Sequence, residues 1–589
     1  MTAKPATIRL RTAGALAATV LLGGGCAVPP RPALPTPAAG TVPAAAATAP
    51  AAPAATAPDA ARSCASAIPG VETVDASRAL RRQHGVPDDV HGAMIIEVLP
   101  GGPAAQAGLA AWDVVERLDA HEVTGAGDFD NRMNAAKCGE PLRVTFRRGG
   151  TQLTTTVSPV DSIRFYTAAC RQGLATGCFR QGWLTAAGVG VAGDGKRAEE
   201  LYDQACRAGS GGACCELARS RHQPERALER VELLERACAL HYAGGCVDLA
   251  FLYATGEGGL ARDDARATPL FVAACDGGEP AGCFNAGLMV SAGRGVPADL
   301  AAAIAAYEDG CRGGVSLACT NLGTHHDEGR GVPAAPERAA TYYRLGCAGS
   351  SVTPGSATAC TNLGVMYRDG RGVEQDAGRA VELFTRVCGG MPAHPDDQDA
   401  AVAAAMACSL LGAQYAHGSG VAADWARAIA LSKQGCAGGD AFGCFNLGAV
   451  YLNGQGADRD DAGALRYFRL ACDHGGGKGC FQAALMYSRG QGAARSDEQA
   501  AAFYQKACDA GNGTGCVNLG GFYTSDVSRA VTLFERGCDL GEPIGCFDLA
   551  NHYADGTGVK ADPARAATLY AQACTGGYEA ACAKASPAH

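Results

Sequence analysis

Apolar residues recur along most of the chain at the three- and four-residue spacing of amphipathic helices, in short segments separated by glycine. One period, 444–472, begins with an apolar segment, passes through a Gly-Gln-Gly turn at 454–456, and ends with a second apolar segment at helical spacing. This spacing predicts helix, turn and helix, since residues three and four positions apart share one helical face. The same pattern recurs at 362–373 and 548–559. We therefore expect a mostly α protein built as an α/α solenoid.

Residues 63–160 carry a different pattern, in which apolar runs alternate with glycine-rich turns. The expected elements are a strand at 92–99, a short helix at 101–109, a strand at 113–115, a helix at 129–136 and a hairpin from 142–146 and 151–157. The run EVLPGGPAAQAGL followed by DVV resembles a bacterial PDZ domain of the kind attached to periplasmic proteases. Trp112 stands where that family usually has Gly. A small α+β PDZ-like domain is expected here.

The PDZ resemblance implies a groove in which backbone N–H groups of a loop hold a peptide carboxylate while the peptide extends a sheet edge. The segment 68–71 matches the loop, and the helix at 129–136 lies across the groove. The candidate peptide-binding residues are Ile68, Gly70, Val71, Arg132 and Met133. Phe129 is interpreted as a core residue. Pro69 lacks the N–H that a carboxylate would use, so the groove either prefers an internal segment or no longer binds.

The N-terminus has the pattern of an export signal. Lys4, Arg9 and Arg11 precede an apolar run at 13–22, which is too short to span a bilayer. The run ends in three glycines and Cys26, which resembles the lipobox of bacterial lipoproteins. We expect 1–26 to be a lipoprotein-type signal with Cys26 lipidated, the alternative being simple secretion. The Ala- and Pro-rich segment 27–62 is expected to be a disordered tether.

This localisation agrees with the 28 cysteines, because cytosolic thiols stay reduced whereas regular pairs in an exported chain predict disulfides. Ten predicted disulfides have seven residues between the cysteines: Cys170–Cys178, Cys206–Cys214, Cys238–Cys246, Cys275–Cys283, Cys311–Cys319, Cys436–Cys444, Cys472–Cys480, Cys508–Cys516, Cys538–Cys546 and Cys574–Cys582. Two more, Cys347–Cys360 and Cys388–Cys408, keep the register with insertions. Cys64–Cys138 is a candidate bridge within 63–160. Cys215 is left over and is interpreted as a buried thiol.

The repeat period identifies a second resemblance. Successive first cysteines such as Cys275, Cys311 and Cys347 are 36 residues apart. This period, the glycine pattern and the C-x7-C pairs resemble the Sel-one-like repeat (SLR) family, specifically its cysteine-rich exported branch. The resemblance implies a superhelix, with about eleven helix pairs in 161–589 and a concave face that binds proteins or peptides.

Charge and motifs exclude several functions. The net charge is −9 and basic residues form no run beyond the extreme N-terminus, which argues against a nucleic-acid partner. The S-x-x-K, G-x-S-x-G and H-E-x-x-H motifs are absent, so no catalytic residue, metal ligand or cofactor is assigned. The cluster at 325–328 (HHDE) is the one candidate metal set, and we favour an incidental substitution because His326 occupies the position of a packing tyrosine.

These patterns predict a non-enzymatic scaffold or adaptor of the cell envelope, anchored at the outer membrane facing the periplasm, or periplasmic or secreted if not lipidated. The expected partners are proteins or peptides, including peptidoglycan-associated ones. The alternative is penicillin binding or weak β-lactam hydrolysis, which the resemblance to cysteine-rich SLR proteins implies. A passive spacer is a third reading. We expect a partner near the insertions in 347–360 and 388–408.

Overall fold

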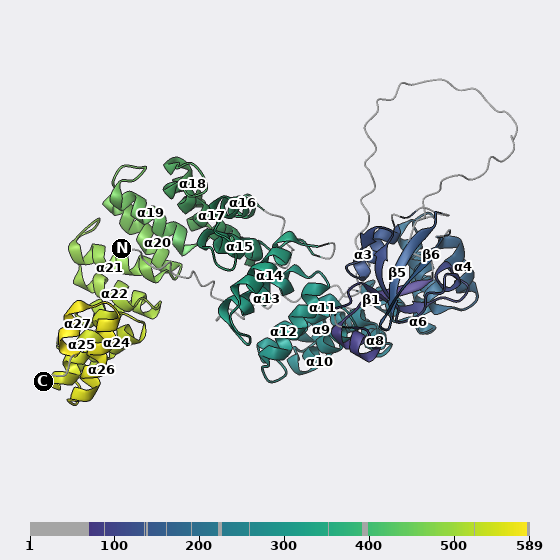
Figure 1. The fold of residues 1–589 in the computed structure, drawn as a ribbon, viewed down its shortest axis with the longest axis horizontal. Coiled ribbons are helices and arrows are strands. Elements are labelled where there is room, and N and C mark those ends of the chain that lie inside the picture. Colours follow the sequence, from purple (N-terminus) through teal and green to yellow (C-terminus); the bar gives the residue numbers. More distant parts are fainter. Residues whose placement is uncertain are drawn as a thin grey trace, which may run out of the picture. The chain divides into compact units, whose positions relative to one another are not determined.

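Figure 1 shows the computed structural model. It describes residues 70–585 except 88, 135, 137–139, 159, 161, 190, 222–225, 258–259, 351–352, 391–398 and 524. The predicted signal, the tether, Ile68, Cys26, Cys64 and Cys138 lie outside the described residues. The described chain forms two compact units that meet between Ser356 and Ala357, and each is treated by itself.

The first unit begins with an antiparallel sheet. Its path runs β1-β2-β3-β5-β6, with β4 paired to β3, so β1 is an edge strand. The strands are β1 Val71–Asp75, β2 Ala93–Val98, β3 Val114–Leu118, β4 His121–Glu122, β5 Leu142–Arg148 and β6 Thr151–Val157. The helices are α1 Arg78–Gln83, α2 Pro103–Gln106 and α3 Ala126–Asn134. This sheet with its helices is called the PDZ-like unit below.

Two sets of contacts stabilise the turn before β3. Trp112 has a positive φ of 74°, which explains why glycine suits this position, and its ring stacks on His84 with centroids 3.7 Å apart. Asp113 is fully buried and both of its oxygens accept hydrogen bonds of 2.7 Å from Arg148. Its carboxylate also accepts from the Ala110 N–H at 2.9 Å. These bonds compensate the cost of burying the charge.

Helix pairs follow. The first unit contains α4 Ser162–Arg171, α5 Ala175–Ala187, α6 Gly195–Arg207, α7 Gly211–Arg219, α8 Ala227–Ala239, α9 Ala243–Thr255, α10 Asp264–Asp276, α11 Pro280–Ser291, α12 Leu300–Arg312, α13 Ser316–Glu328 and α14 Pro336–Ala348. The second contains α15 Ala357–Asp369, α16 Ala377–Cys388, α17 Asp399–His417, α18 Trp425–Ala437, α19 Ala441–Asn453, α20 Asp461–Asp473, α21 Gly477–Arg489, α22 Asp497–Asp509, α23 Gly513–Gly520, α24 Val527–Asp539, α25 Pro543–Asp555, α26 Pro563–Thr575 and α27 Glu579–Ala585. Helix A and helix B denote the first and second helix of a pair. The predicted fold class, a mostly α solenoid preceded by a small α+β unit, is confirmed.

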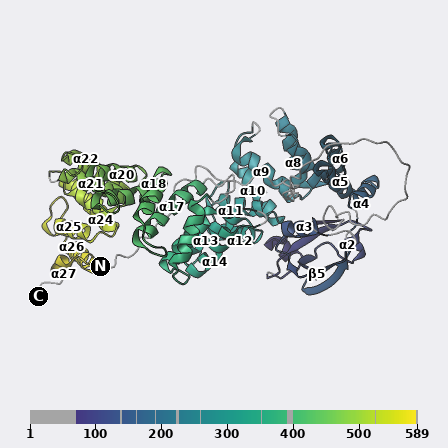
Figure 2. The same cartoon turned by 90° about the horizontal axis from the view of Figure 1, so that it is seen from above.

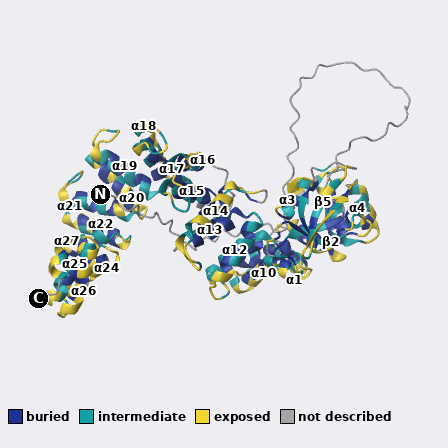
Figure 3. Cartoon of the chain, in the orientation of Figure 1, coloured by how far each residue is buried: buried dark blue, intermediate teal, exposed yellow. Residues whose placement is uncertain are grey.

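The two helices of a pair differ in burial. Helix A is central: in α9, ten of thirteen residues are buried, against five of thirteen in α10. Within each unit, exposed residues gather on helix B and at the turns (Figure 3). Close contact inside a pair depends on glycine, since a Cβ at Gly448 would lie 2.6 Å from the Phe468 ring and one at Gly323 would lie 2.7 Å from the Tyr343 ring. Helix B and the turns are therefore the accessible surface of the array.

Disulfides join the end of each helix B to the start of the next helix A. Eleven of the predicted solenoid pairs, all except Cys347–Cys360, are bonded to each other with Cα atoms 4.3 to 4.8 Å apart. Cys347 and Cys360 are also disulfide-bonded. Cys215 is disulfide-bonded as well, so its interpretation as a spare thiol is wrong. The count of cysteine pairs in the sequence could not reveal that Cys215 is bonded, because it had already assigned Cys64 and Cys138 to each other.

Candidate functional site

The edge strand β1 and helix α3 frame the candidate groove. The Ala126 N–H donates to Asp75 Oδ1 at 2.6 Å, which fixes the start of α3 to the end of β1. A Cβ at Gly125 would lie 2.4 Å from the same oxygen, so a larger residue there would displace the Asp75 carboxylate. An extended peptide that adds to this sheet would lie along the edge of β1 opposite β2, with α3 beside it.

The structure brings four of the predicted groove residues to this region. Val71 is 4% exposed and Met133 is fully buried, so both pack in the core with Phe129. Arg132 is half-buried, with its Nε 2.9 Å from Asp128. Gly70 is buried, and its N–H donates to the hydroxyl of Tyr166 at 3.1 Å. The Gly70 N–H, which we expected to bind a peptide carboxylate, therefore already donates to a tyrosine of α4.

A polar interface lies where the PDZ-like unit meets the first repeats. Burial, together with the neighbouring Asp75, raises the pKa of the Glu279 carboxyl to about 8. Earlier in the array, on α7, burial raises the pKa of Glu216 to about 7 although Arg219 lies 2.6 Å away. A cavity of about 20 Å³ beside Asp75 and Arg312 has room for about one water molecule. This cavity is too small for an organic ligand.

A second candidate surface recurs along the array, and sequence analysis did not single it out. A tyrosine near the end of helix A, or three residues beyond it in the case of Tyr523, lies under an arginine from the first turn of helix B. The distance from guanidinium carbon to ring centroid is 5.4 Å for Arg266 on Tyr253, 5.4 Å for Arg379 on Tyr367, 5.5 Å for Arg427 on Tyr415 and 4.1 Å for Arg529 on Tyr523. We call these four the Tyr–Arg pairs.

In the Tyr–Arg pairs the arginine is accessible, whereas the tyrosine ring beneath it is buried or half-buried, with Tyr253 and Tyr367 each 8% exposed. The side chains of Arg266, Arg379 and Arg427 are 66%, 62% and 66% exposed. In each pair an aspartate three residues before the arginine caps helix B through the arginine N–H, as Asp376 does at 2.9 Å. The signal was present in the sequence as a tyrosine seven residues after the second cysteine, followed by Asp-x-x-Arg. Tyrosine and arginine are the residue types enriched at binding hot spots.

The histidine cluster packs inside the array. His325 Nδ1 is 2.8 Å from the Arg330 carbonyl oxygen, and burial lowers its pKa. The His326 ring stacks on Tyr342 with centroids 5.4 Å apart, and burial also lowers its pKa. Among the described residues, no group of three or more His, Cys, Asp or Glu side chains is placed to hold a metal ion.

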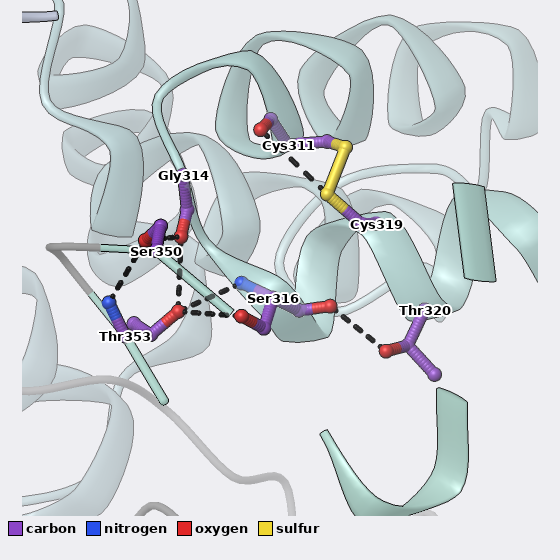
Figure 4. The surroundings of a disulfide bond; sticks show 7 residues. All are labelled: Cys311, Gly314, Ser316, Cys319, Thr320, Ser350 and Thr353. Atoms are coloured by element: carbon purple, nitrogen blue, oxygen red, sulfur yellow. Dashed lines mark hydrogen bonds between the residues drawn. A yellow bond between two sulfur atoms is a disulfide. The ribbon is translucent and has the colours of Figure 1, made fainter. Parts of the chain in front are cut away.

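The insertion between Cys347 and Cys360 packs on the preceding turn (Figure 4). The Thr353 hydroxyl accepts from the Ser316 N–H at 2.8 Å, and the Ser350 hydroxyl donates to the Gly314 carbonyl at 2.6 Å. The insertion thereby caps the start of α13 beside the Cys311–Cys319 disulfide. Ser350 and Thr353 of this insertion are therefore engaged in hydrogen bonds within the chain.

Comparison with known proteins finds similar proteins for the PDZ-like unit and for the repeat array. A family model described as a PDZ domain matches residues 70–158. The same region is 38% identical over 80 residues to the serine protease HhoB of Synechocystis, covering 13% of this chain and 19% of that protein. It is 35% identical over 81 residues to serine protease HTRA1B of Danio rerio, covering 14% and 16%. The chain thus spans less than a fifth of these relatives.

Solved structures resemble the repeat array only in part. One is c5321, a protective antigen of uropathogenic Escherichia coli with an SLR fold: it is 23% identical, the match covers 72% of this chain and 81% of that one, and the TM-score is 0.40. Another is a Sel1 repeat protein of Oxalobacter formigenes, 24% identical, covering 54% and 88% with a TM-score of 0.40. No described helix is both long and apolar enough to cross a bilayer.

The repeat assignment comes from a family model described as Sel1 repeat. It matches ten segments: 175–210, 243–279, 280–308, 316–351, 357–388, 405–440, 441–476, 477–512, 515–542 and 543–578. The resemblances to PDZ and Sel-one-like repeats inferred from sequence are therefore confirmed. Since the matched repeats together span more than half of the residues, the chain belongs to the Sel1 repeat family.

Proposed function

We propose that this protein is a scaffold of the cell envelope that binds protein partners through the exposed edge of its repeat array. The observation that carries the proposal is the set of Tyr–Arg pairs, in which an exposed guanidinium is held over a tyrosine ring at the same register position in four of the repeats. Because the stacked side chains are already restricted, less rotamer entropy is lost when a partner binds.

The proposed compartment is oxidising, because disulfides in every solenoid register would not persist in a reducing cytosol. Within that compartment we place a lipid anchor at Cys26 and a tether at 27–62, with the outer membrane facing the periplasm as the site of anchoring. The pattern of residues 1–26 supports this part of the proposal. Wall-associated proteins are one class of partner that such an anchor would bring within reach.

The test is site-specific photo-crosslinking in intact cells. A benzophenone amino acid replaces Arg379 or Arg427, and the matched control carries it at Arg469, an exposed arginine of α20 outside the Tyr–Arg pairs. A discrete protein adduct from both Tyr–Arg positions and none from the control would support the proposal. Equal labelling at all three positions would refute it, and turnover of nitrocefin by the oxidised full chain would favour the hydrolase alternative.

A further inference from the structure

The edge of β1, where a PDZ domain takes its peptide, faces the first repeats of the same chain. The PDZ-like unit lies alongside these repeats in both views (Figures 1 and 2). No residue of β1 is exposed, although β1 is the end strand of the sheet path. An uncovered edge strand would leave its outer side chains and backbone open to water.

One end of the edge is covered by α4. The Tyr166 hydroxyl accepts from the Gly70 N–H, and Tyr166 is 3% exposed in a cluster with Leu99 and Leu184. A Cβ at Gly70 would lie 3.4 Å from the ring of Phe165. A peptide carboxylate at this loop would have to displace both rings.

The other end is covered by the turn between α10 and α11. A Cβ at Gly278 would lie 2.4 Å from the Asp75 carbonyl oxygen, so the main chain of this turn touches the last residue of β1. The Ser77 hydroxyl donates to the Asp276 carbonyl at 2.9 Å, and Arg78 forms an ion pair with Glu308. An added strand needs a lane about 4.8 Å from β1. Beside Asp75, the turn already occupies the position that such a strand would take.

The repeat register shows that this contact is specific to one place in the array. Gly278 follows the first cysteine of its pair by three residues and has a φ of +86°. At seven equivalent glycines, a Cβ would meet nothing within 4 Å: Gly173, Gly209, Gly439, Gly475, Gly511, Gly541 and Gly577. The space that is open at those turns is filled at Gly278 by β1.

We propose that the repeat array closes the PDZ-like groove in cis, with Tyr166 in place of a peptide carboxylate and the Gly278 turn in place of the bound strand. A ligand of the groove, an extended peptide segment that adds to β1, binds after the PDZ-like unit separates from these repeats. Its apparent affinity is reduced by the fraction of molecules that are open, so 1% open costs about 100-fold. This inference rests on the proposed role of the PDZ-like unit as a binding module.

The test compares Gly278→Ala with Gly511→Ala in the full-length oxidised chain. Both substitutions impose an alanine at positive φ in an equivalent turn, but only the first drives a Cβ into β1. Hydrogen exchange of residues 71–83 measures closure without reference to any ligand. We expect exchange about tenfold faster or more in Gly278→Ala and unchanged in Gly511→Ala, while β5–β6 exchange stays the same in both.

Tyr166→Phe, which removes one hydroxyl and keeps the ring, is a milder variant should Gly278→Ala misfold, and it should speed exchange at Gly70. Equal protection of 71–83 in all chains would overturn the closure itself. A library of random heptapeptides, displayed both as internal segments and at a free C-terminus, then tests the ligand: sequences should enrich on Gly278→Ala and not on the parent chain. Enrichment on both or on neither would overturn the regulatory role while leaving the crosslinking test of the array unaffected.

Discussion

Gly448→Ala is expected to destabilise one helix pair measurably. The added methyl would lie 2.6 Å from Phe468 Cδ1 and 2.7 Å from Cε1, and Phe468 is 1% exposed. The ring has no route to solvent, so the pair α19 and α20 must separate. Overpacking of this kind costs about 1–3 kcal/mol. Replacing glycine inside a helix returns about 0.5–1 kcal/mol, which leaves a net loss of about 0.5–2 kcal/mol.

Native-state hydrogen exchange of α19 and α20 is the appropriate assay, because repeat arrays open locally and a global midpoint would average over many pairs. A loss of about 0.5–2 kcal/mol corresponds to exchange about 2- to 30-fold faster in these helices. The matched control is Gly378→Ala in α16, where the methyl would meet only Asp376 Oδ1 at 3.3 Å.

The control should be neutral or slightly stabilising, since it gains helix propensity without a buried clash. Unchanged or slower exchange of α19 and α20 in Gly448→Ala would refute the argument from close packing. The argument would also be wrong if Gly378→Ala accelerated exchange of its own pair to the same extent. An equivalent result at Gly323, under Tyr343, would extend the rule to the first unit.

Three further predictions follow from other contacts. Replacing both Cys472 and Cys480 by alanine should lower the local free energy of unfolding by about 2.5 kcal/mol, because the disulfide closes a loop of eight residues and so restricts the unfolded chain. Hydrogen exchange of the flanking helices during denaturation measures this loss. The pKa of Glu279 is raised to about 8 from 4.5, so its contribution favours the folded contact below about pH 4.5 and is lost as pH rises towards 8. The protection of 71–83, taken relative to the intrinsic exchange rate at each pH, should fall over that window, and Glu279→Gln should flatten the change. Arg148→Gln should destabilise the PDZ-like unit by about 2 kcal/mol in thermal unfolding, because buried Asp113 loses both guanidinium hydrogen bonds, and an unchanged midpoint would count against a structural role for this pair.

The helix pairs could be predicted because their determinants are local. Glycine at the end of helix A, as at Gly454 with a φ of +67°, and an aspartate cap at the start of helix B, as at Asp460, mark each element within a few residues. Cysteine spacing supplied the register. The β5–β6 hairpin around 148–150 was predictable for the same reason.

The candidate site was only partly predictable, because its decisive contacts join distant residues. Gly70 and Val71 could be assigned to the groove from resemblance alone, but the hydrogen bond from Gly70 to Tyr166 spans 96 positions and has no local signal. The Gly278 turn has the same sequence pattern as its open equivalents, so nothing in its own repeat distinguishes it. The Tyr–Arg pairs, in contrast, had a local signal in the tyrosine register that could have been found.

The proposed closure places a quantitative demand on any ligand of the groove. Residues tethered within one chain compete at an effective concentration on the order of millimolar, so a free peptide of ordinary affinity and low abundance would lose to Tyr166 and the Gly278 turn. A partner that first docks on the repeat surface raises the local concentration of its own tail to the same order. The Tyr–Arg pairs and the closed groove would then act in sequence, and selectivity would come from requiring both contacts in one partner.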